Sequence, residues 1–232
     1  MAGGQGKRMN ADMPKQFMLL AGKPVLMHTI EVFAAYDKSL EIIVVLPESQ
    51  IETWFKLCRE HSFEIPHSVV EGGEERFHSV KNGLAFLQLP ALVAVHDGVR
   101  PLVSRETISR CFAMAKKTGT AVPVVELTDS IREISGNENR AVDRHLYKLV
   151  QTPQVFDGEI LKKSYGQNFS NSFTDDASVV ETLGENISLV EGNRENIKIT
   201  AAFDLDIAES FIGRNSVSCA GSPHTEACVA LR

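Results

Sequence analysis

Short apolar runs alternate with segments of helical periodicity along most of the chain. Residues 40–46 and 92–96 are nearly continuous apolar runs, which are typical of strands covered on both faces. Shorter runs at 68–70, 121–125 and 187–190 predict three further strands, and Pro123 favours an edge or bulge position in the second of these. Because helical segments separate the strands, the pattern predicts a three-layer α/β fold with a mainly parallel, twisted sheet.

Capping signals mark several of the intervening helices. Ser49 opens an S-x-x-E capping box, so a helix should run from there to about residue 61. Ser104 is an N-cap candidate for a helix that should stop at Gly119. Thr174 resembles an N-cap with acidic residues in the following first turn. Helical patterns also cover residues 24–36, 75–87, 157–165, 175–183 and 204–212.

Two segments break this rhythm. Residues 126–149 mix charges with short apolar pairs around a polar turn, which predicts a two-stranded β-arm that leaves the sheet. An isolated two-stranded ribbon is marginally stable in water, so the arm should pack on something, and a partner subunit is a natural candidate. Residues 214–232 lack periodicity and are expected to form a disordered tail behind a single domain of residues 1–213.

Composition narrows the class of protein. The 232 residues include 24 Lys and Arg against 30 Asp and Glu, a net charge of −6, which argues against a binder of duplex nucleic acid. The four cysteines form no C-x-x-C pair, which indicates a reduced, cytoplasmic protein without a structural metal. No apolar run approaches the roughly 20 residues of a membrane span, so we expect no membrane partner.

The first motif that suggests chemistry is the glycine-rich stretch A-G-G-Q-G-K-R-M at residues 2–9, which P-K-Q follows at 14–16. Glycines let the backbone approach a triphosphate and direct N–H groups at its oxygens. Arg8 and Lys15 would add positive charge where negative charge builds on a phosphorus under attack. The alternative is a solvated turn with surface cations. The stretch is neither a Walker A loop nor a G-x-G-x-x-G motif.

The second motif is V-H-D-G-V-R-P at residues 95–101, at the end of a predicted strand. Ligands of open α/β sheets bind beyond the carboxyl ends of strands. Asp97 there could hold Mg²⁺ on the phosphates of a nucleotide. The alternative is an aspartate that caps the following turn. His96 is interpreted as a packed or hydrogen-bonded residue rather than as a metal ligand.

Further segments carry polar residues whose individual signals are weak. Each has an ordinary structural explanation, such as a helix start, a surface ion pair or a solvent-facing strand position. These segments are G-G-E-E-R-F-H-S at 72–79, D-R at 143–144, Q-T-P-Q at 151–154, T-D-D-A-S at 174–178 and N-I-K-I-T at 196–200.

Taken together and in this order, the motifs resemble those of the 2-C-methyl-D-erythritol 4-phosphate cytidylyltransferase family, from residue 2 to about residue 212. The resemblance implies the fold of the nucleotide-diphospho-sugar transferases. It implies that CMP is transferred from CTP to a sugar-alcohol phosphate, with Mg²⁺ as the cofactor and pyrophosphate as the leaving group. It also implies a homodimer formed through the arm, about residues 126–149, which lends residues to the partner's active site.

The resemblance also implies roles for individual residues. Implied catalytic residues are Arg8, Lys15, Arg144 and Lys198. Implied nucleotide-binding residues are Ala2, Gly3, Gly4, Gly6, Gly73, Glu74 and Ser79. Implied substrate-binding residues are Asp97, Arg100, Ser130, Thr152 and Thr174, with Asp97 also at the metal. Arg144, Arg100 and Ser130 would act in the neighbouring subunit.

Two alternatives stay open, the first because of one departure from the family and the second because only the sugar-side residues distinguish related enzymes. Family members carry an apolar strand before the glycine loop, whereas only Met1 and Ala2 precede Gly3 here. That strand is normally central, so its loss would expose the flanking strands. A non-catalytic nucleotide-binding protein is therefore one alternative. A ribitol 5-phosphate cytidylyltransferase, which would use the same CTP machinery with a linear polyol phosphate, is the other.

Overall fold

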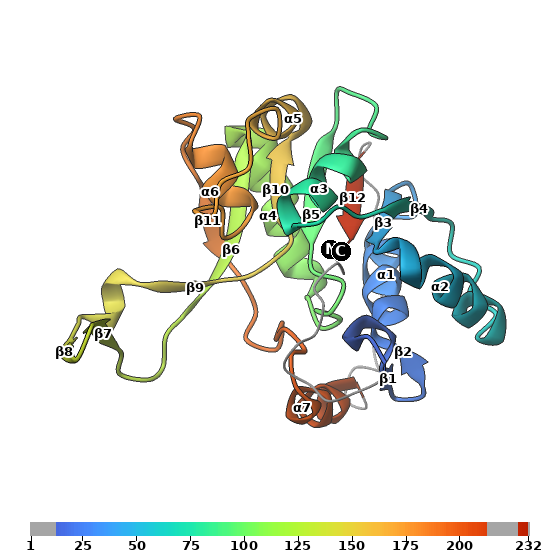
Figure 1. Cartoon of the computed structure of the whole chain (residues 1–232), viewed down its shortest axis with the longest axis horizontal. Helices are drawn as coiled ribbons and strands as arrows, with labels where there is room; N and C mark the ends of the chain where they lie inside the picture. Colours follow the sequence, from blue (N-terminus) through green and yellow to red (C-terminus); the bar gives the residue numbers. More distant parts are fainter. Residues whose placement is uncertain (1–12, 213–226, 232) are drawn as a thin grey trace.

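The computed structural model describes residues 13–212 and the backbone of residues 227–231. A mixed sheet runs through the molecule in the order β11-β6-β10-β5-β12-β3-β4, with β9 paired to β6 (Figure 1). The strands are β3 (Glu41–Leu46), β4 (Ser68–Glu71), β5 (Leu92–His96), β6 (Thr120–Glu126), β9 (Lys148–Val150), β10 (Gln154–Asp157), β11 (Leu189–Glu191) and β12 (Ala227–Leu231). Neighbours are parallel except where β10 meets β5 and β6 and where β9 meets β6.

Helices cover both faces of this sheet. Side chains alternate along β3, so that Ile42 and Val44 enter one hydrophobic cluster while Ile43 and Val45 enter the other. The first cluster includes side chains of α1 (Val25–Tyr36), α2 (Glu48–Glu60) and α4 (Arg105–Thr118). The second includes side chains of α3 (Arg76–Leu84), α5 (Gly158–Ser164) and α6 (Asp176–Glu181). The three-layer α/β prediction is thus confirmed.

The capping predictions had mixed outcomes. Ser104 caps α4 by accepting a hydrogen bond from the Thr107 amide, and Gly119 ends the helix in the left-handed conformation, as predicted. The capping box predicted at Ser49 is wrong, because α2 begins one residue earlier, after Pro47, without a side-chain cap. Thr174 is not the N-cap of α6 either, because Asp175 accepts the hydrogen bond from the Ser178 amide.

Pro123 does not lie on an edge strand, since β6 pairs with β11 on one side and with β10 and β9 on the other. On that second side, β10 pairs with Thr120 and Ala121 of β6, and β9 pairs with β6 from Val124 onward. Pro123 therefore falls where the second partner changes, and its missing N–H interrupts no pairing there. Strand β10 was not predicted as a strand.

The predicted excursion is present as an arm that projects from the body of the molecule (Figure 1). Strands β7 (Arg132–Ser135) and β8 (Glu138–Ala141) pair antiparallel, and all eight of their residues are exposed. The short 3-10 helix η2 (Arg144–Leu146) leads from this hairpin to β9.

The C-terminal segment contradicts the expectation of a disordered tail over residues 227–231. Strand β12 lies in the middle of the sheet, where it pairs in parallel with β3 on one side and with β5 on the other. The flanking strands are therefore not exposed, contrary to the sequence expectation. Residues 214–226 and 232 lie outside the described part of the chain.

A smaller cluster packs below the sheet. The last helix α7 (Ala202–Ile212) contributes Ala208, which packs with Leu20 and Val25 and with Ile199. Leu20 belongs to a small hairpin of two short strands, β1 (Leu19–Leu20) and β2 (Lys23–Pro24), which follows the 3-10 helix η1 (Lys15–Phe17). Among the helices of residues 13–212, none combines the length and apolar character needed to cross a bilayer.

Candidate active site

Several of the polar residues singled out in the sequence lie at one edge of the sheet. Asp97 follows the end of β5, and Gly72 and Gly73 follow the end of β4. Thr152 precedes the antiparallel β10, and Lys198 lies in the segment after β11. This is the carboxyl edge of the parallel strands, where open α/β sheets bind ligands.

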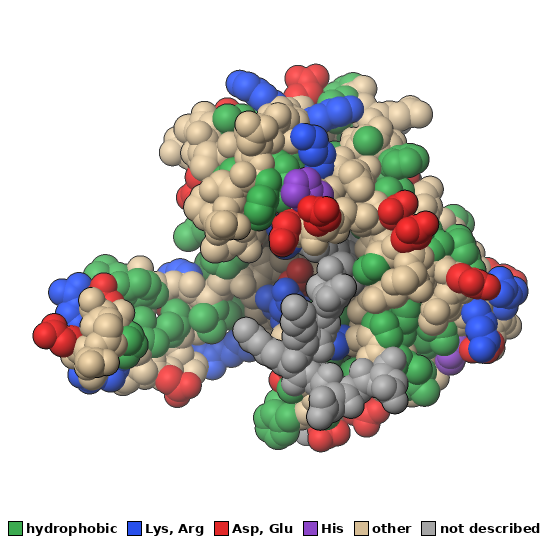
Figure 2. All heavy atoms as spheres, in the orientation of Figure 1, with side chains coloured by type: hydrophobic (Ala, Val, Ile, Leu, Met, Phe, Trp, Pro, Cys, Tyr) green, Lys and Arg blue, Asp and Glu red, His purple; other side chains and the backbone are tan. Residues whose placement is uncertain are grey.

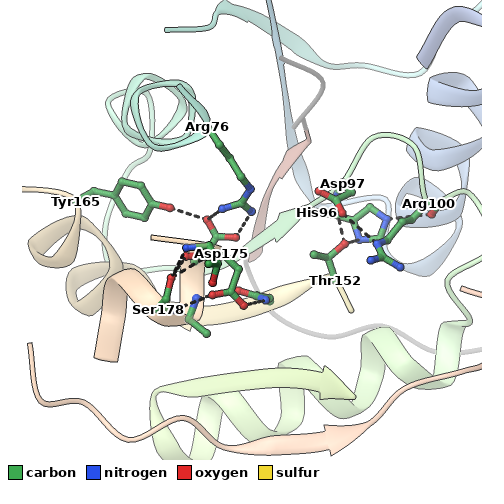
Figure 3. A network of polar contacts seen from close by, with 12 residues as sticks. Arg76, His96, Asp97, Arg100, Thr152, Tyr165, Asp175 and Ser178 are labelled. Atoms are coloured by element: carbon green, nitrogen blue, oxygen red, sulfur yellow. Dashed lines mark hydrogen bonds and ion pairs between the residues drawn. The ribbon is translucent and has the colours of Figure 1, made fainter. Parts of the chain in front are cut away.

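Asp97 forms ion pairs with two cations, Arg100, which Figure 3 shows beside it, and Lys198. Its carboxylate is almost fully buried, and Lys198 Nζ and Arg100 Nε each lie 3.0 Å from the same oxygen, Oδ2. Burial by itself would raise the pKa of Asp97, but the charges of Lys198, Arg76 and Arg100 outweigh it and hold the pKa below its ordinary value. Asp97 is therefore a carboxylate across the physiological pH range.

A hydrogen-bonded chain fixes the backbone around Asp97. The Asp97 amide donates to Thr152 Oγ1 at 3.0 Å, and Thr152 Oγ1 lies 3.0 Å from His96 Nδ1. His96 Nε2 lies 3.0 Å from the carbonyl oxygen of Arg100. Because a carbonyl only accepts, Nε2 carries the proton and Nδ1 accepts from the Thr152 hydroxyl.

His96 is fully buried, and this burial lowers its pKa to about 3. The imidazole is therefore neutral near pH 7 and serves to position Thr152 and the turn after Asp97. This confirms the interpretation of His96 as a packed, hydrogen-bonded residue.

The loop after β4 is shaped by Ser79. The Gly73 amide donates to Ser79 Oγ at 3.1 Å, and the same hydroxyl lies 3.1 Å from the carbonyl oxygen of Glu75. A Cβ at Gly73 would lie 2.4 Å from the His78 Cβ, so this close approach requires glycine. Glu74 is exposed at the loop. The described contacts of Ser79 are thus within the loop, which turns toward the same edge of the sheet as Asp97.

An ion pair that the sequence did not single out connects this loop to helix α6 (Figure 3). Arg76 Nη1 donates to Asp176 Oδ1 at 2.8 Å, and Nη2 donates to Asp176 Oδ2. The Tyr165 hydroxyl donates to Asp176 Oδ1 at 2.6 Å. Asp176 is fully buried. Arg76 and Asp176 lie inside the motifs at 72–79 and 174–178, but only complementary charge across 100 residues could have indicated their pairing.

The remaining predicted residues are distributed around and beyond this edge. Lys15 begins η1 and is half-buried. Burial would raise the pKa of Asp204, but hydrogen bonds from Thr200 and Ala201 lower it, and the charge of Lys15 lowers it further. Thr174 is exposed just before α6. Ala2, Gly3, Gly4, Gly6 and Arg8 lie outside the described residues.

Arg100 was expected to act in a neighbouring subunit but contacts Asp97 of its own chain. Arg144 and Ser130 are not brought to Asp97 within this chain. Both belong to the arm, which extends away from the sheet edge that carries Asp97 (Figure 1). Ser130 is exposed, and the Arg144 guanidinium donates to the carbonyl oxygen of Thr128 in the same arm.

Asp97 also fits the one metal contact expected from the sequence. Mg²⁺ takes one or two carboxylates together with phosphate oxygens, and Asp97 is a carboxylate held in its ionised form. Within residues 13–212 there is no group of three or more His, Cys, Asp or Glu side chains arranged to hold a metal ion.

Comparison with known proteins gives a consistent result. The family model described as 2-C-methyl-D-erythritol 4-phosphate cytidylyltransferase matches residues 1–214. A Bacteroides thetaiotaomicron protein of that name is 55% identical over 212 residues, which cover 91% of this chain and 97% of the relative. A Porphyromonas gingivalis protein of the same name is 50% identical over 210 residues, 90% of this chain and 94% of the relative.

Solved structures agree with the sequence relatives. The crystal structure of 2-C-methyl-D-erythritol 4-phosphate cytidylyltransferase from Thermus thermophilus superposes with a TM-score of 0.70 at 33% identity, covering 85% of this chain and 93% of that one. The crystal structure of 4-diphosphocytidyl-2C-methyl-D-erythritol synthase from Anaerococcus prevotii has a TM-score of 0.76 at 26% identity, covering 92% and 93%.

Proposed function

The chain belongs to the 2-C-methyl-D-erythritol 4-phosphate cytidylyltransferase family, and from this premise we propose how its site performs the reaction. The enzyme transfers CMP from CTP to 2-C-methyl-D-erythritol 4-phosphate and releases pyrophosphate, a step of non-mevalonate isoprenoid biosynthesis. The observation that supports this function best is the buried Asp97 carboxylate between Lys198 and Arg100 at the carboxyl edge of the sheet.

The reaction requires positive charge that stabilises the phosphate groups, and it does not require a general base. An oxygen of the sugar-alcohol phosphate attacks the α-phosphorus of CTP, and a new P–O bond forms as the bond to the pyrophosphate oxygen breaks. The nucleophile is already an anion, so no proton has to be removed from it. The barrier comes from bringing two anions together and from the charge that builds on the α-phosphorus, and fixed cations lower both costs.

We assign the cations accordingly. Lys15 and Arg8 would stabilise the charge on the phosphate groups of CTP, and Lys198 would orient the attacking phosphate beside Asp97. When bound at Asp97, Mg²⁺ would add positive charge at the α-phosphate. Arg100 keeps Asp97 in place and is itself held by the carbonyl oxygen of Asn196, 2.7 Å from its Nη1.

Binding surfaces for the two substrates would lie on either side of Asp97. On the nucleotide side the loop after β4 would offer Gly73, Glu74 and Ser79, and the glycine stretch would contribute Ala2, Gly3, Gly4 and Gly6. On the sugar-phosphate side the candidates are Arg100, Thr152 and Thr174, with Ser130 supplied by the arm. Thr152 is placed by its contacts with the Asp97 amide and His96.

The arm would complete the site of a second copy in a homodimer. It exposes large apolar side chains, with Ile134 68% and Leu146 80% accessible, and Figure 2 shows hydrophobic groups spread along it. Burial of such groups is the driving force for association. Since the arm carries Arg144 away from its own Asp97, Arg144 and Ser130 would act on the partner's substrate phosphate.

The organisation of the chain follows from the same proposal. Residues 1–213 together with strand β12 would form a single nucleotidyltransferase domain, with residues of about 126–149 as the dimerisation arm. Cys58 and Cys111 are free thiols, which is consistent with work in the reducing cytoplasm.

Two alternatives are less well supported. The relatives reported above are named for the methylerythritol substrate, not for ribitol 5-phosphate. The non-catalytic alternative was motivated by the missing first strand, which would leave its neighbours in the sheet unpaired. Strand β12 pairs with both β3 and β5 and occupies the position between them.

A direct assay tests the function. The full chain is supplied with CTP, Mg²⁺ and either methylerythritol phosphate or ribitol 5-phosphate, and pyrophosphate release is followed. Release with methylerythritol phosphate, and little when the ribitol compound replaces it, is the expected result. A preference for ribitol 5-phosphate would move the enzyme to the related polyol class. CTP binding without release from either substrate would support a non-catalytic protein.

A further inference from the structure

The ion pair between Arg76 and Asp176 lies where two functional segments meet. Arg76 is the first residue of α3 and directly follows the loop of residues 72–75. Asp176 is the first residue of α6 and directly follows Thr174 and Asp175. One contact therefore joins the loop assigned to the nucleotide with the segment assigned to the sugar phosphate.

The carboxylate is held in a single orientation. Both of its oxygens accept from the Arg76 guanidinium, and Oδ1 also accepts from the Tyr165 hydroxyl. Asp176 is fully buried, and the Arg76 side chain is 28% exposed. A planar guanidinium that binds both oxygens of a carboxylate fixes direction as well as distance, which a lysine ammonium does not.

The N-terminal end of α6 is in turn hydrogen-bonded to the sheet. Gln154 Nε2 donates to Asp175 Oδ2 at 2.8 Å, and Gln154 Oε1 accepts from the Ala177 amide at 2.9 Å. Gln154 begins β10 and pairs with Val95 of β5, two residues before Asp97. A continuous set of contacts thus runs from the strand that carries Asp97 to the loop after β4.

Resting on the proposed function, we propose that Arg76 and Asp176 are positioning residues that hold the loop of residues 72–75 in its CTP-binding position. Asp176 anchors the guanidinium, and Arg76 anchors the start of α3, so Gly73 and Glu74 keep their place relative to Asp97. The positive charge of Arg76 also acts on Asp97. Gln154 also anchors the start of α6, through Asp175 and the Ala177 amide, so the segment with Thr174 keeps a second anchor when the ion pair is broken. Loss of the pair should therefore affect recognition of CTP more than recognition of the sugar phosphate.

The test compares Arg76→Lys with the wild-type chain. Lysine keeps the charge but cannot bind both carboxylate oxygens. CTP affinity, measured by calorimetric titration of the full chain with CTP and Mg²⁺, should fall about tenfold, the loss expected from one charge-assisted hydrogen bond. The KM for the sugar phosphate should stay close to the wild-type value. Arg105→Lys is the matched control, because Arg105 also begins a helix and donates to a backbone carbonyl, that of Ala35.

Further variants separate positioning from general stability. Asp176→Asn should weaken CTP binding to a similar degree, and the double variant should lose little more, because both changes break one interaction. Tyr165→Phe removes the hydroxyl bond to Asp176 and should give a smaller loss of CTP affinity, because the Arg76–Asp176 pair remains. Unchanged CTP affinity in folded Arg76→Lys, or equal losses for both substrates, would overturn the proposal. The titration needs no turnover, so it tests the positioning role even if the wild-type chain releases no pyrophosphate.

Discussion

At the scale of single residues, Lys198 acts together with Arg76 and Arg100 to keep Asp97 ionised. Lys198 is the largest of the favourable charges that lower the Asp97 pKa against the effect of burial. Replacing it by Met should therefore raise the pKa of Asp97 and shift the acid limb of the pH–rate profile to higher pH. The loss of a preorganised charge should also reduce kcat roughly 10²-fold. Lys198→Arg keeps the charge and should retain the wild-type acid limb; a shift of equal size in both variants would contradict the assignment.

His96 gives a second prediction, for stability. Its pKa is about 3 in the folded chain and ordinarily about 6.5, so between these values the unfolded state binds a proton that the folded state does not. Stability should therefore fall as the pH drops below 6.5, and the His96 part should reach about 2 kcal/mol between pH 8 and pH 5. Urea unfolding of the wild-type chain and of His96→Gln at both pH values measures this contribution. The free energy of unfolding of the glutamine variant should fall by about 2 kcal/mol less between pH 8 and pH 5 than that of the wild type. Parallel pH curves for the two chains would show that His96 is not the responsible group.

At the scale of secondary structure, the sequence was informative where a local signal decides the outcome. Ser104 and Gly119 mark the ends of α4 because a hydroxyl cap and a left-handed glycine act within a few residues. At α6 the choice between Thr174 and Asp175 as N-cap could not be read locally, since both side chains can cap. Strand β10 was missed because its four residues become a strand only by pairing with β5 and β6.

The arm provides the prediction that belongs to this scale. Lys15→Ala and Arg144→Ala chains are each expected to be inactive. If Arg144 acts on the partner, a mixed dimer keeps one intact site, with Lys15 from one chain and Arg144 from the other. Random mixing makes half of the dimers mixed, so on the order of a quarter of wild-type pyrophosphate release should return.

Purified mixed dimers are the stronger form of this experiment. Two different affinity tags allow their isolation, and dimers of either single variant serve as controls. An isolated mixed dimer with no activity would show that Arg144 works within its own chain or not at all.

At the scale of the whole molecule, the site depends on contacts between residues far apart in the sequence, which local sequence patterns do not predict. The family resemblance placed Asp97 and Lys198 in one site, and the two lie in contact, but it expected Arg100 to act in a neighbouring subunit, whereas Arg100 contacts Asp97 of its own chain. The Arg76–Asp176 pair and the place of β12 had no such guide. Five apolar residues near the end of the chain carry too little periodicity to predict a central strand.

Strand β12 leads to the prediction that concerns the entire fold. Its five residues pair with β5, and four of them also pair with β3, so it joins the strand that carries Asp97 to the other half of the sheet. A chain truncated after residue 226 should therefore lose both stability and pyrophosphate release. Val229→Pro should act in the same direction, because a proline in a central strand leaves buried backbone groups unpaired at about 1–3 kcal/mol each.

The matched control is Val229→Ile, which keeps an apolar, β-branched residue at the same position and should fold and turn over normally. Thermal unfolding and the pyrophosphate assay are carried out on the truncated chain, Val229→Pro and Val229→Ile. Together they show whether the fold requires β12 or whether this segment is dispensable. Adding a peptide of residues 223–232 to the truncated chain should restore part of the activity, since the peptide can occupy the same position between β3 and β5. Full stability and activity of the truncated chain would instead show that the sheet closes without β12, and that Asp97 is held by β5 and β10 alone.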